Sequence, residues 1–259
     1  MSVNTLHMRY RQFHLPKRGE KAEDYEDSAD GDPERGRFAI ADGAAGSSWS
    51  ALWARLLVEE FVKSPKPQPE PFARWLPAVQ QRWAAVVNAR PNHAQPAPWY
   101  VEDRIQQGAF AAFLGVVIDE ATTWRGGKRK RWQALAIGDC CLFQVRDNRL
   151  VKAAPLGRAK DFGNTPWLVG SRSPLDKTLS KKTVHLKGDW TANDRLWLMT
   201  DALALWFLQQ LEQGHRPWRA LDRLLLAGEP NGAFVEWINE LRGAQQLRND
   251  DMTLLAVCL

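Results

Sequence analysis

The sequence predicts an α+β fold in which antiparallel sheets are covered by helices. Runs with strand patterns dominate residues 109–154, and runs with helical periodicity dominate residues 201–243. Strand-rich and helix-rich stretches that alternate in blocks along a chain are typical of this class. The chain has 259 residues, 44% of them hydrophobic, which is enough for a substantial core. No break divides it, so we expect one domain over residues 1–259.

The first part of the chain predicts strands and helices that alternate. Residues 5–15 alternate apolar and polar side chains, whereas residues 17–36 are charged and irregular. A short strand at 37–41 ends at Asp42. A helix at 47–62, capped by Ser47 or Ser48, and a Pro-rich connector at 63–71 follow. The second helix, 72–90, carries an apolar stripe of Trp75, Leu76, Val79, Trp83 and Val86.

The rest of the chain begins with strands and ends with helices and a last strand. Asp147 and Asn148 predict a tight hairpin turn between two of the strands. The 13 tryptophans fall mostly on apolar stripes or in strands, which favours core packing. The expected strands are 109–118, 131–137, 141–153, 182–186, 194–200 and 251–259, and the expected helices are 201–213, 217–228 and 232–243.

The net charge and the absence of targeting signals indicate which partners and which cellular location to expect. The net charge of +5 and the pI near 9.2 suit nucleic acid or a phosphate-bearing substrate. The one dense basic run, 125–131, is interpreted as a solvated hairpin tip or as a nucleic-acid patch. No apolar run is long enough to span a membrane, and the N-terminus lacks an apolar signal core. We therefore expect a cytoplasmic protein with no membrane partner.

The three cysteines predict neither disulfides nor zinc. They are Cys140, Cys141 and Cys258, and none has metal-ligand spacing with another cysteine or a histidine. Cys140 and Cys141 lie in an apolar run and are expected to be buried and unreactive.

Acidic side chains follow or precede several apolar strands. They are Asp42, Asp139, Asp201, Asp250 and Asp251. Each alone is compatible with a turn residue or a helix cap, as at Asp201. If several converge, however, they cannot all remain ionised without a cation between them. Their hard oxygen atoms would then select Mg²⁺ or Mn²⁺ rather than zinc.

The order of the acidic motifs resembles that of the metal-dependent Ser/Thr protein phosphatases of type 2C, the PPM family, in their compact bacterial form. The resemblance covers nearly the whole chain. It is carried by YEDS (25–28), ADGAAGSS (41–48), IGDC (137–140), MTDALALW (199–206) and NDDMTLLAV (249–257).

This resemblance implies a fold of two antiparallel sheets packed as a sandwich and flanked by helices. It also implies a helical insert at about 72–107 and a flap-like segment at about 158–180. Two Mg²⁺ or Mn²⁺ ions, with a weaker third ion, would be the cofactors. The reaction implied is hydrolysis of phosphoserine and phosphothreonine in proteins by a water molecule that bridges the two ions.

The resemblance further implies roles for individual residues. Asp42 would bridge the ions, Gly43 would ligate through its carbonyl, and Asp201 and Asp250 would hold the first ion. Those three aspartates form the catalytic set.

Other positions of the resemblance have supporting roles. Asp139 would hold the third ion and Asp251 would support the ligands. The early acidic pair is Glu26 and Asp27, with Glu26 near the second ion and Asp27 behind it; Glu23 and Asp24 offer a second register. Ala22 stands where the family often has a phosphate-binding arginine, so Lys21 or Arg18 is expected to hold phosphate.

Three functions remain open from the sequence. The first is an active phosphatase, expected to be monomeric, whose substrate is a phosphoprotein made by a Ser/Thr kinase in bacterial signalling. The second is a pseudophosphatase that binds a phosphorylated partner protein without hydrolysis. The third is a basic nucleic-acid-binding protein that uses residues 125–131.

Overall fold

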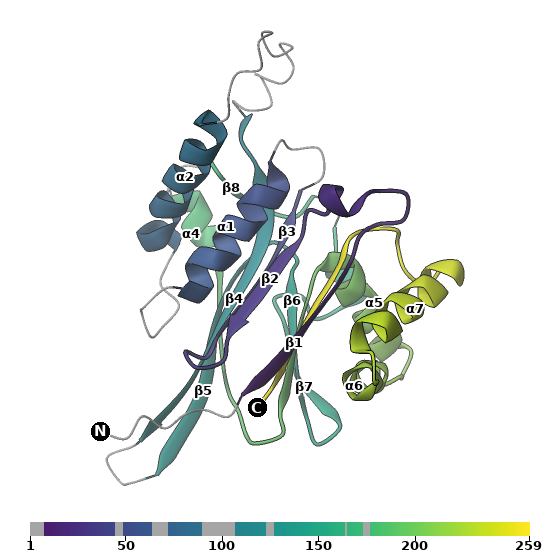
Figure 1. Cartoon of the computed structure of the whole chain (residues 1–259). Coiled ribbons are helices and arrows are strands. Elements are labelled where there is room, and N and C mark those ends of the chain that lie inside the picture. The colour runs from purple at the N-terminus through teal and green to yellow at the C-terminus, as the bar shows by residue number, and fades with distance from the viewer. Residues whose placement is uncertain are drawn as a thin grey trace.

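A computed structural model describes residues 8–44, 49–63, 72–89, 107–122, 127–163, 165–172 and 177–259. Two sheets stack face to face, and helices cover the outer face of each, as Figure 1 shows. All strand pairs are antiparallel. The α+β class and the helix-flanked sandwich are therefore confirmed.

Sheet A carries the C-terminal helices. Its order is β1 (Arg9–Leu15), β11 (Met252–Cys258), β10 (Arg195–Met199), β6 (Cys141–Arg146) and β7 (Arg149–Ala154). Its outer face is covered by α5 (Asp201–Glu212), α6 (Trp218–Leu226) and α7 (Pro230–Gly243).

Sheet B carries the other helices. Its order is β2 (Ser28–Asp32), β3 (Arg37–Gly43), β4 (Phe110–Thr122), β5 (Lys128–Ile137) and β9 (Val184–Asp189), and β8 (Val169–Gly170) pairs with β4. Its outer face is covered by α1 (Ser50–Lys63), α2 (Phe72–Asn88) and α4 (Lys177–Lys182). Two short 3-10 turns, η1 (Ala22–Asp24) and η2 (Ala159–Asp161), lie in connections.

The alternation of side chains along each central strand builds three apolar layers. On β3, Phe38 and Ile40 point between the sheets, whereas Ala39 and Ala41 point toward the helices. A strand that is apolar on both faces can therefore be buried on both faces. This is why strands such as 37–41 were recognisable as continuous apolar runs.

Several predicted boundaries were wrong for reasons that lie in tertiary packing. The irregular segment 17–36 contains β2, a polar edge strand whose Gly31 lies under the ring of Phe38, its partner on β3. Helix α1 begins at Ser50 because Trp49 adopts a left-handed φ of 73°. The predicted caps Ser47 and Ser48 lie outside the described residues.

The apolar stripe predicted on α2 is confirmed except at its last residue. Val86 is 40% exposed, and Val87 is buried instead. Together with Leu76, Val79 and Trp83, Val87 follows the 3.6-residue period more closely. Residues 90–106 of the expected insert, 64–71 of the connector and 125–126 of the basic run lie outside the described residues.

Glycine 188 on β9 is packed directly against the indole ring of Trp132, its partner on β5. A Cβ atom at this position would lie 2.5–2.7 Å from three ring atoms. The ring is fully buried, and its Nε1 donates a hydrogen bond to Oε1 of Gln144 at 3.0 Å. It therefore cannot move aside without losing that bond.

Gly188→Ala is expected to lower the free energy of unfolding by about 1–3 kcal/mol, because overpacking strains the interior. Urea denaturation of the variant and the wild type measures this. Gly157→Ala is the matched control, since a Cβ at Gly157 meets nothing within 4 Å. Equal losses in both variants would show that the contact with Trp132 is unimportant.

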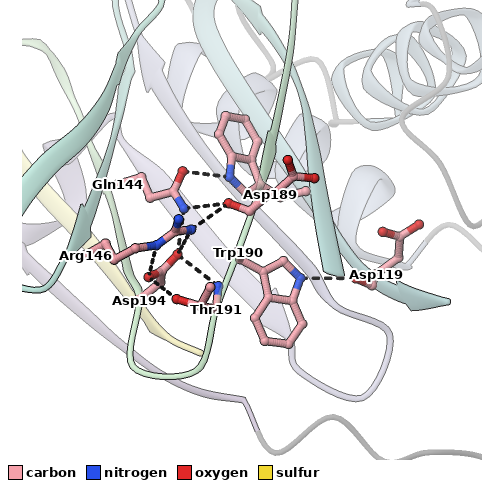
Figure 2. Close-up of polar contacts among 8 residues, drawn as sticks. Asp119, Gln144, Arg146, Asp189, Trp190, Thr191 and Asp194 are labelled. Carbon is pink, nitrogen blue, oxygen red and sulfur yellow. Dashed lines mark hydrogen bonds and ion pairs between the residues drawn. The ribbon is translucent and has the colours of Figure 1, made fainter. Parts of the chain in front are cut away.

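A buried polar cluster joins the two sheets at the start of β10. Asp194 is 1% exposed, and its carboxylate accepts hydrogen bonds from Arg146, Gln144 and Thr191 (Figure 2). Nearby, Trp190 Nε1 donates to the carbonyl oxygen of Asp119 at 3.1 Å (Figure 2). Asp194 precedes β10, whereas Asp201 follows it, so this cluster lies at the opposite end of that strand from Asp201.

Candidate active site

Strand ends bring the predicted acidic residues to one cavity of about 310 Å³. Asp42 lies at the end of β3, Asp201 begins α5 and is separated from the end of β10 by one residue, and Asp139 lies in the turn between β5 and β6. Six acidic residues line the cavity: Glu26, Asp42, Asp139, Asp201, Asp250 and Asp251. Residues far apart in the sequence therefore meet because their strands end at the same edge of the sandwich.

Two glycines shape the backbone at this edge. Gly138 has a φ of 91°, and a Cβ there would lie 2.5 Å from that of Ala112, so glycine is needed for the turn before Asp139. At Gly43 a Cβ would lie 2.7 Å from the carbonyl oxygen of Glu26. Close packing against Glu26 and Ser50 therefore requires glycine at position 43.

Burial and mutual repulsion raise the pKa of the cavity aspartates. The pKa of Asp42 is raised well above its usual value, first by burial and then by the charges of Asp27 and Asp201. Burial also raises the pKa of Asp201, against the opposing effect of Arg248. For Asp139, burial and then the charge of Asp201 raise the pKa to about 6. The cavity therefore holds more negative charge than the surrounding protein compensates.

The structure distinguishes the two registers of the early acidic pair. Glu26 lines the cavity, and its carboxylate accepts a hydrogen bond from the hydroxyl of Ser50. Asp27 is buried behind it and accepts a hydrogen bond from Thr253 at 2.7 Å. By contrast, Glu23 and Asp24 lie in the exposed turn η1.

Asp251 fixes the N-terminal segment to the last strand. Its two carboxylate oxygens accept hydrogen bonds from the backbone amides of Lys17, at 2.9 Å, and Glu26, at 2.8 Å. The adjacent Asp250 accepts a hydrogen bond from the amide of Asp251 at 3.0 Å. Asp251 thus fixes the backbone at Glu26, and its expected role in support of metal ligands stays a prediction.

The expected phosphate-binding residues do not reach the cavity. The Lys21 side chain is exposed and pairs with Glu23 at 3.4 Å, and Arg18 is held through its backbone by Asn249. Among the described residues that line the cavity, the one basic side chain is that of Arg248. We did not single it out from the sequence, where its place two residues before Asp250 was the available signal.

The predicted flap contributes the apolar wall of the cavity. Gly163, Pro166 and Leu168 line it. The flap is attached to sheet B where β8 pairs with β4, and Trp53 donates a hydrogen bond to the carbonyl of Val169 at 2.9 Å. Residues 164 and 173–176 of this segment lie outside the described residues.

Three basic side chains in the described part of the basic run have partners within the protein. Lys128 pairs with Glu120 at 2.5 Å, and Arg131 pairs with Asp189 at 3.4 Å. The ammonium group of Lys130 lies 4.4 Å from the centre of the Trp190 ring. All three residues belong to β5, beside the expected tip, and nucleic-acid binding by this run stays a prediction.

Other expectations have clear outcomes. Cys140 and Cys141 are buried as predicted, and burial raises the pKa of both thiols. In the part of the chain that the structure describes, no helix has the length and apolar character needed to cross a membrane.

Comparison with known proteins identifies the fold. No family model and no curated protein matches the sequence. The serine/threonine phosphatase PstP/Ppp of Mycobacterium tuberculosis aligns at a TM-score of 0.59 with 15% identity, over 97% of this chain and 98% of its own. The catalytic domain of PstP in complex with two manganese ions aligns at 0.57 with 16% identity, over 97% of each chain.

Two further structures agree. PppA, described as a key regulatory component of T6SS in Pseudomonas aeruginosa, aligns at 0.56 with 15% identity over 98% of each chain. The PPM Ser-Thr phosphatase MsPP from Mycobacterium smegmatis aligns at 0.51 with 17% identity, also over 98% of each chain. The chain has the type 2C phosphatase fold. At these identities the likeness establishes the fold, and the activity has to be argued from the residues.

The oxygen atoms that line the cavity are of the chemical type that binds a divalent cation. Carboxylates and a backbone carbonyl are the ligands that Mg²⁺ and Mn²⁺ prefer. The raised pKa values of Asp42 and Asp201 indicate uncompensated negative charge that such an ion would neutralise. Among the described residues, however, no three acidic, histidine or cysteine side chains are grouped closely enough to hold an ion. Metal binding in this type 2C fold would therefore require the side chains to draw together.

The raised pKa of Asp139 predicts that replacing it with neutral asparagine increases the stability of the folded protein by an amount that depends on pH. In the unfolded chain Asp139 loses its proton near pH 4, whereas in the folded protein it does so near pH 6. Between these values the folded state binds more protons, so its stability falls as the pH rises. In metal-free protein, Asp139→Asn should become progressively more stable than the wild type, by roughly 3 kcal/mol at pH 7.

Urea denaturation in EDTA at several pH values tests this. The advantage of Asp139→Asn should grow between about pH 4 and 6 and then level off. An advantage that is constant with pH would contradict the assignment. Asp189→Asn is the control, because the side chain of Asp189 is 77% exposed.

Proposed function

We propose that the protein is a Mg²⁺- or Mn²⁺-dependent phosphatase of phosphoserine and phosphothreonine in proteins. The observation that carries the proposal is the convergence of six acidic residues, from five separate parts of the chain, on one cavity. The matching order of motifs and the type 2C fold support it. Its substrates would be phosphoproteins made by a Ser/Thr kinase in the cytoplasm.

Each residue at the cavity would have a role in the reaction that follows from its position. Asp42, the Gly43 carbonyl, Asp201 and Asp250 would hold two ions, Glu26 would act near the second, and Asp139 would hold a weaker third. When bound, the ions would activate water for in-line attack on phosphorus and neutralise charge on the phosphoryl oxygens. Asp27 and Asp251 would fix the ligands from behind. The apolar wall at Pro166 and Leu168 would limit access of bulk water.

Two observations favour a second candidate, a pseudophosphatase that binds a phosphorylated partner. Arg248 already contacts Asp201 at 2.6 Å, and the described acidic side chains are not grouped tightly enough for an ion. A protein that remained in this arrangement would hold no ion and would therefore have no activated water for hydrolysis.

Hydrolysis of p-nitrophenyl phosphate and of a phosphothreonine peptide distinguishes the two candidates. An active phosphatase should release phosphate from both with Mn²⁺ and from neither with EDTA. A pseudophosphatase should bind the peptide, measured by fluorescence anisotropy, and release no phosphate. Folded protein that binds Mn²⁺ but does not turn over would overturn the enzymatic proposal.

A further inference from the structure

Arg248 occupies a carboxylate that the proposed function assigns to a metal ion. Its Nη2 donates a hydrogen bond to Oδ2 of Asp201 at 2.6 Å. The Arg248 side chain is 49% exposed, whereas that of Asp201 is 17% exposed. An ion that uses Asp201 must therefore compete with the guanidinium group for the same carboxylate.

The backbone around Arg248 is anchored while its side chain reaches into the cavity. The Asn249 side chain accepts a hydrogen bond from the amide of Arg18 at 2.7 Å and donates one to its carbonyl at 3.0 Å. The carbonyl of Asp250 accepts a hydrogen bond from Arg242 at 2.6 Å. A change of partner by Arg248 would thus require rotation of its side chain and no rearrangement of the turn.

Arginine has the chemistry to serve a second partner in the same cavity. Its planar guanidinium presents several N–H donors that match the oxygens of a phosphate group. No other basic side chain of the described residues lines the cavity. A divalent ion on Asp201 would displace the guanidinium, which would then be available where the phosphoryl group must bind.

We propose that Arg248 exchanges partners: it pairs with Asp201 in the metal-free site and binds the phosphoryl group of the substrate once an ion holds Asp201. This proposal rests on the proposed function, because it names the residue that recognises phosphate at the same site. It assigns to Arg248 the role that the sequence led us to expect of Lys21 or Arg18.

Calorimetric titration of metal-free protein with MnCl₂ tests the first half of the proposal. Arg248→Ala should bind Mn²⁺ about fivefold more tightly than the wild type, because the competing ion pair is gone. Arg35→Ala is the matched control: Arg35 forms an exposed pair with Asp32 at 3.5 Å and does not line the cavity. The affinity of Arg35→Ala for Mn²⁺ should equal that of the wild type.

Titration of the Mn²⁺-loaded proteins with inorganic phosphate tests the second half. Arg248→Ala should bind phosphate about tenfold more weakly than the wild type does. The affinity of Arg248→Lys should lie between those of Arg248→Ala and the wild type, and Arg35→Ala should match the wild type. Circular dichroism would verify that each variant is folded.

Two results would overturn the exchange: unchanged or weaker Mn²⁺ binding by Arg248→Ala, or unchanged phosphate binding by its Mn²⁺-loaded form. Neither readout needs turnover. If both variant effects appear but no phosphoester is hydrolysed, only the proposed enzymatic function fails. If the wild type binds no Mn²⁺, both proposals fail together.

Discussion

Asp42→Asn is expected to abolish Mn²⁺-dependent phosphatase activity and, at the same time, to stabilise the metal-free protein. The two effects have one cause. Burial and the charges of Asp27 and Asp201 disfavour the ionised Asp42 carboxylate, so a neutral side chain of the same shape relieves repulsion. The same carboxylate would hold the ions in the proposed function, and its loss should lower kcat/KM by at least about a thousandfold.

The measurements are phosphate release from a phosphothreonine peptide with Mn²⁺ and thermal unfolding in EDTA. Asp189→Asn serves as the control, since its exposed side chain pairs with Arg131 away from the cavity. It should retain activity and have the melting temperature of the wild type. If Asp42→Asn remains active, the assignment of Asp42 as a metal ligand is wrong. If the variant is inactive but less stable than the wild type, the carboxylates do not repel one another in the metal-free site.

Asp194→Ala should cause the largest loss of stability, about 3–5 kcal/mol. The carboxylate accepts two hydrogen bonds from Arg146, at 2.7 and 2.8 Å, and one from Gln144 at 2.7 Å. The amide and hydroxyl of Thr191 add two more, at 3.1 and 2.9 Å (Figure 2). Burial alone would raise the pKa of Asp194, but these hydrogen bonds lower it. Removal of the acid leaves buried donors unsatisfied.

Urea denaturation measures the loss, with Asp161→Ala as the matched control. Asp161 forms an exposed ion pair with Arg158 at 3.2 Å, which should contribute less than about 1 kcal/mol. Because Asp194 and Asp201 lie at opposite ends of β10, the folded fraction of Asp194→Ala should keep the kcat/KM of the wild type. A loss no larger than that of Asp161→Ala would show that the cluster does not stabilise the fold.

Local patterns in the sequence were enough to predict most elements and the positions of the acidic residues. The alternation at 5–15, the apolar run at 37–41 and the turn at Asp147 and Asn148 depend on neighbours in the chain. The first gives strand β1 over Arg9–Leu15, and the other two were confirmed. Polar β2 could not be recognised in this way. It is a strand because β3 pairs with it and because Gly31 accommodates the ring of Phe38.

The sequence by itself determined the fold class and the order of carboxylates, since strand periodicity and the residues that end each strand are local properties. Only the tertiary structure decided which charges meet. It brought Glu26 rather than Glu23 to the cavity, and it placed Arg248 on Asp201 while Lys21 stayed at the surface. Whether two charged side chains are in contact depends on where their separate strands end in space. That distance cannot be derived from the number of residues between them in the sequence.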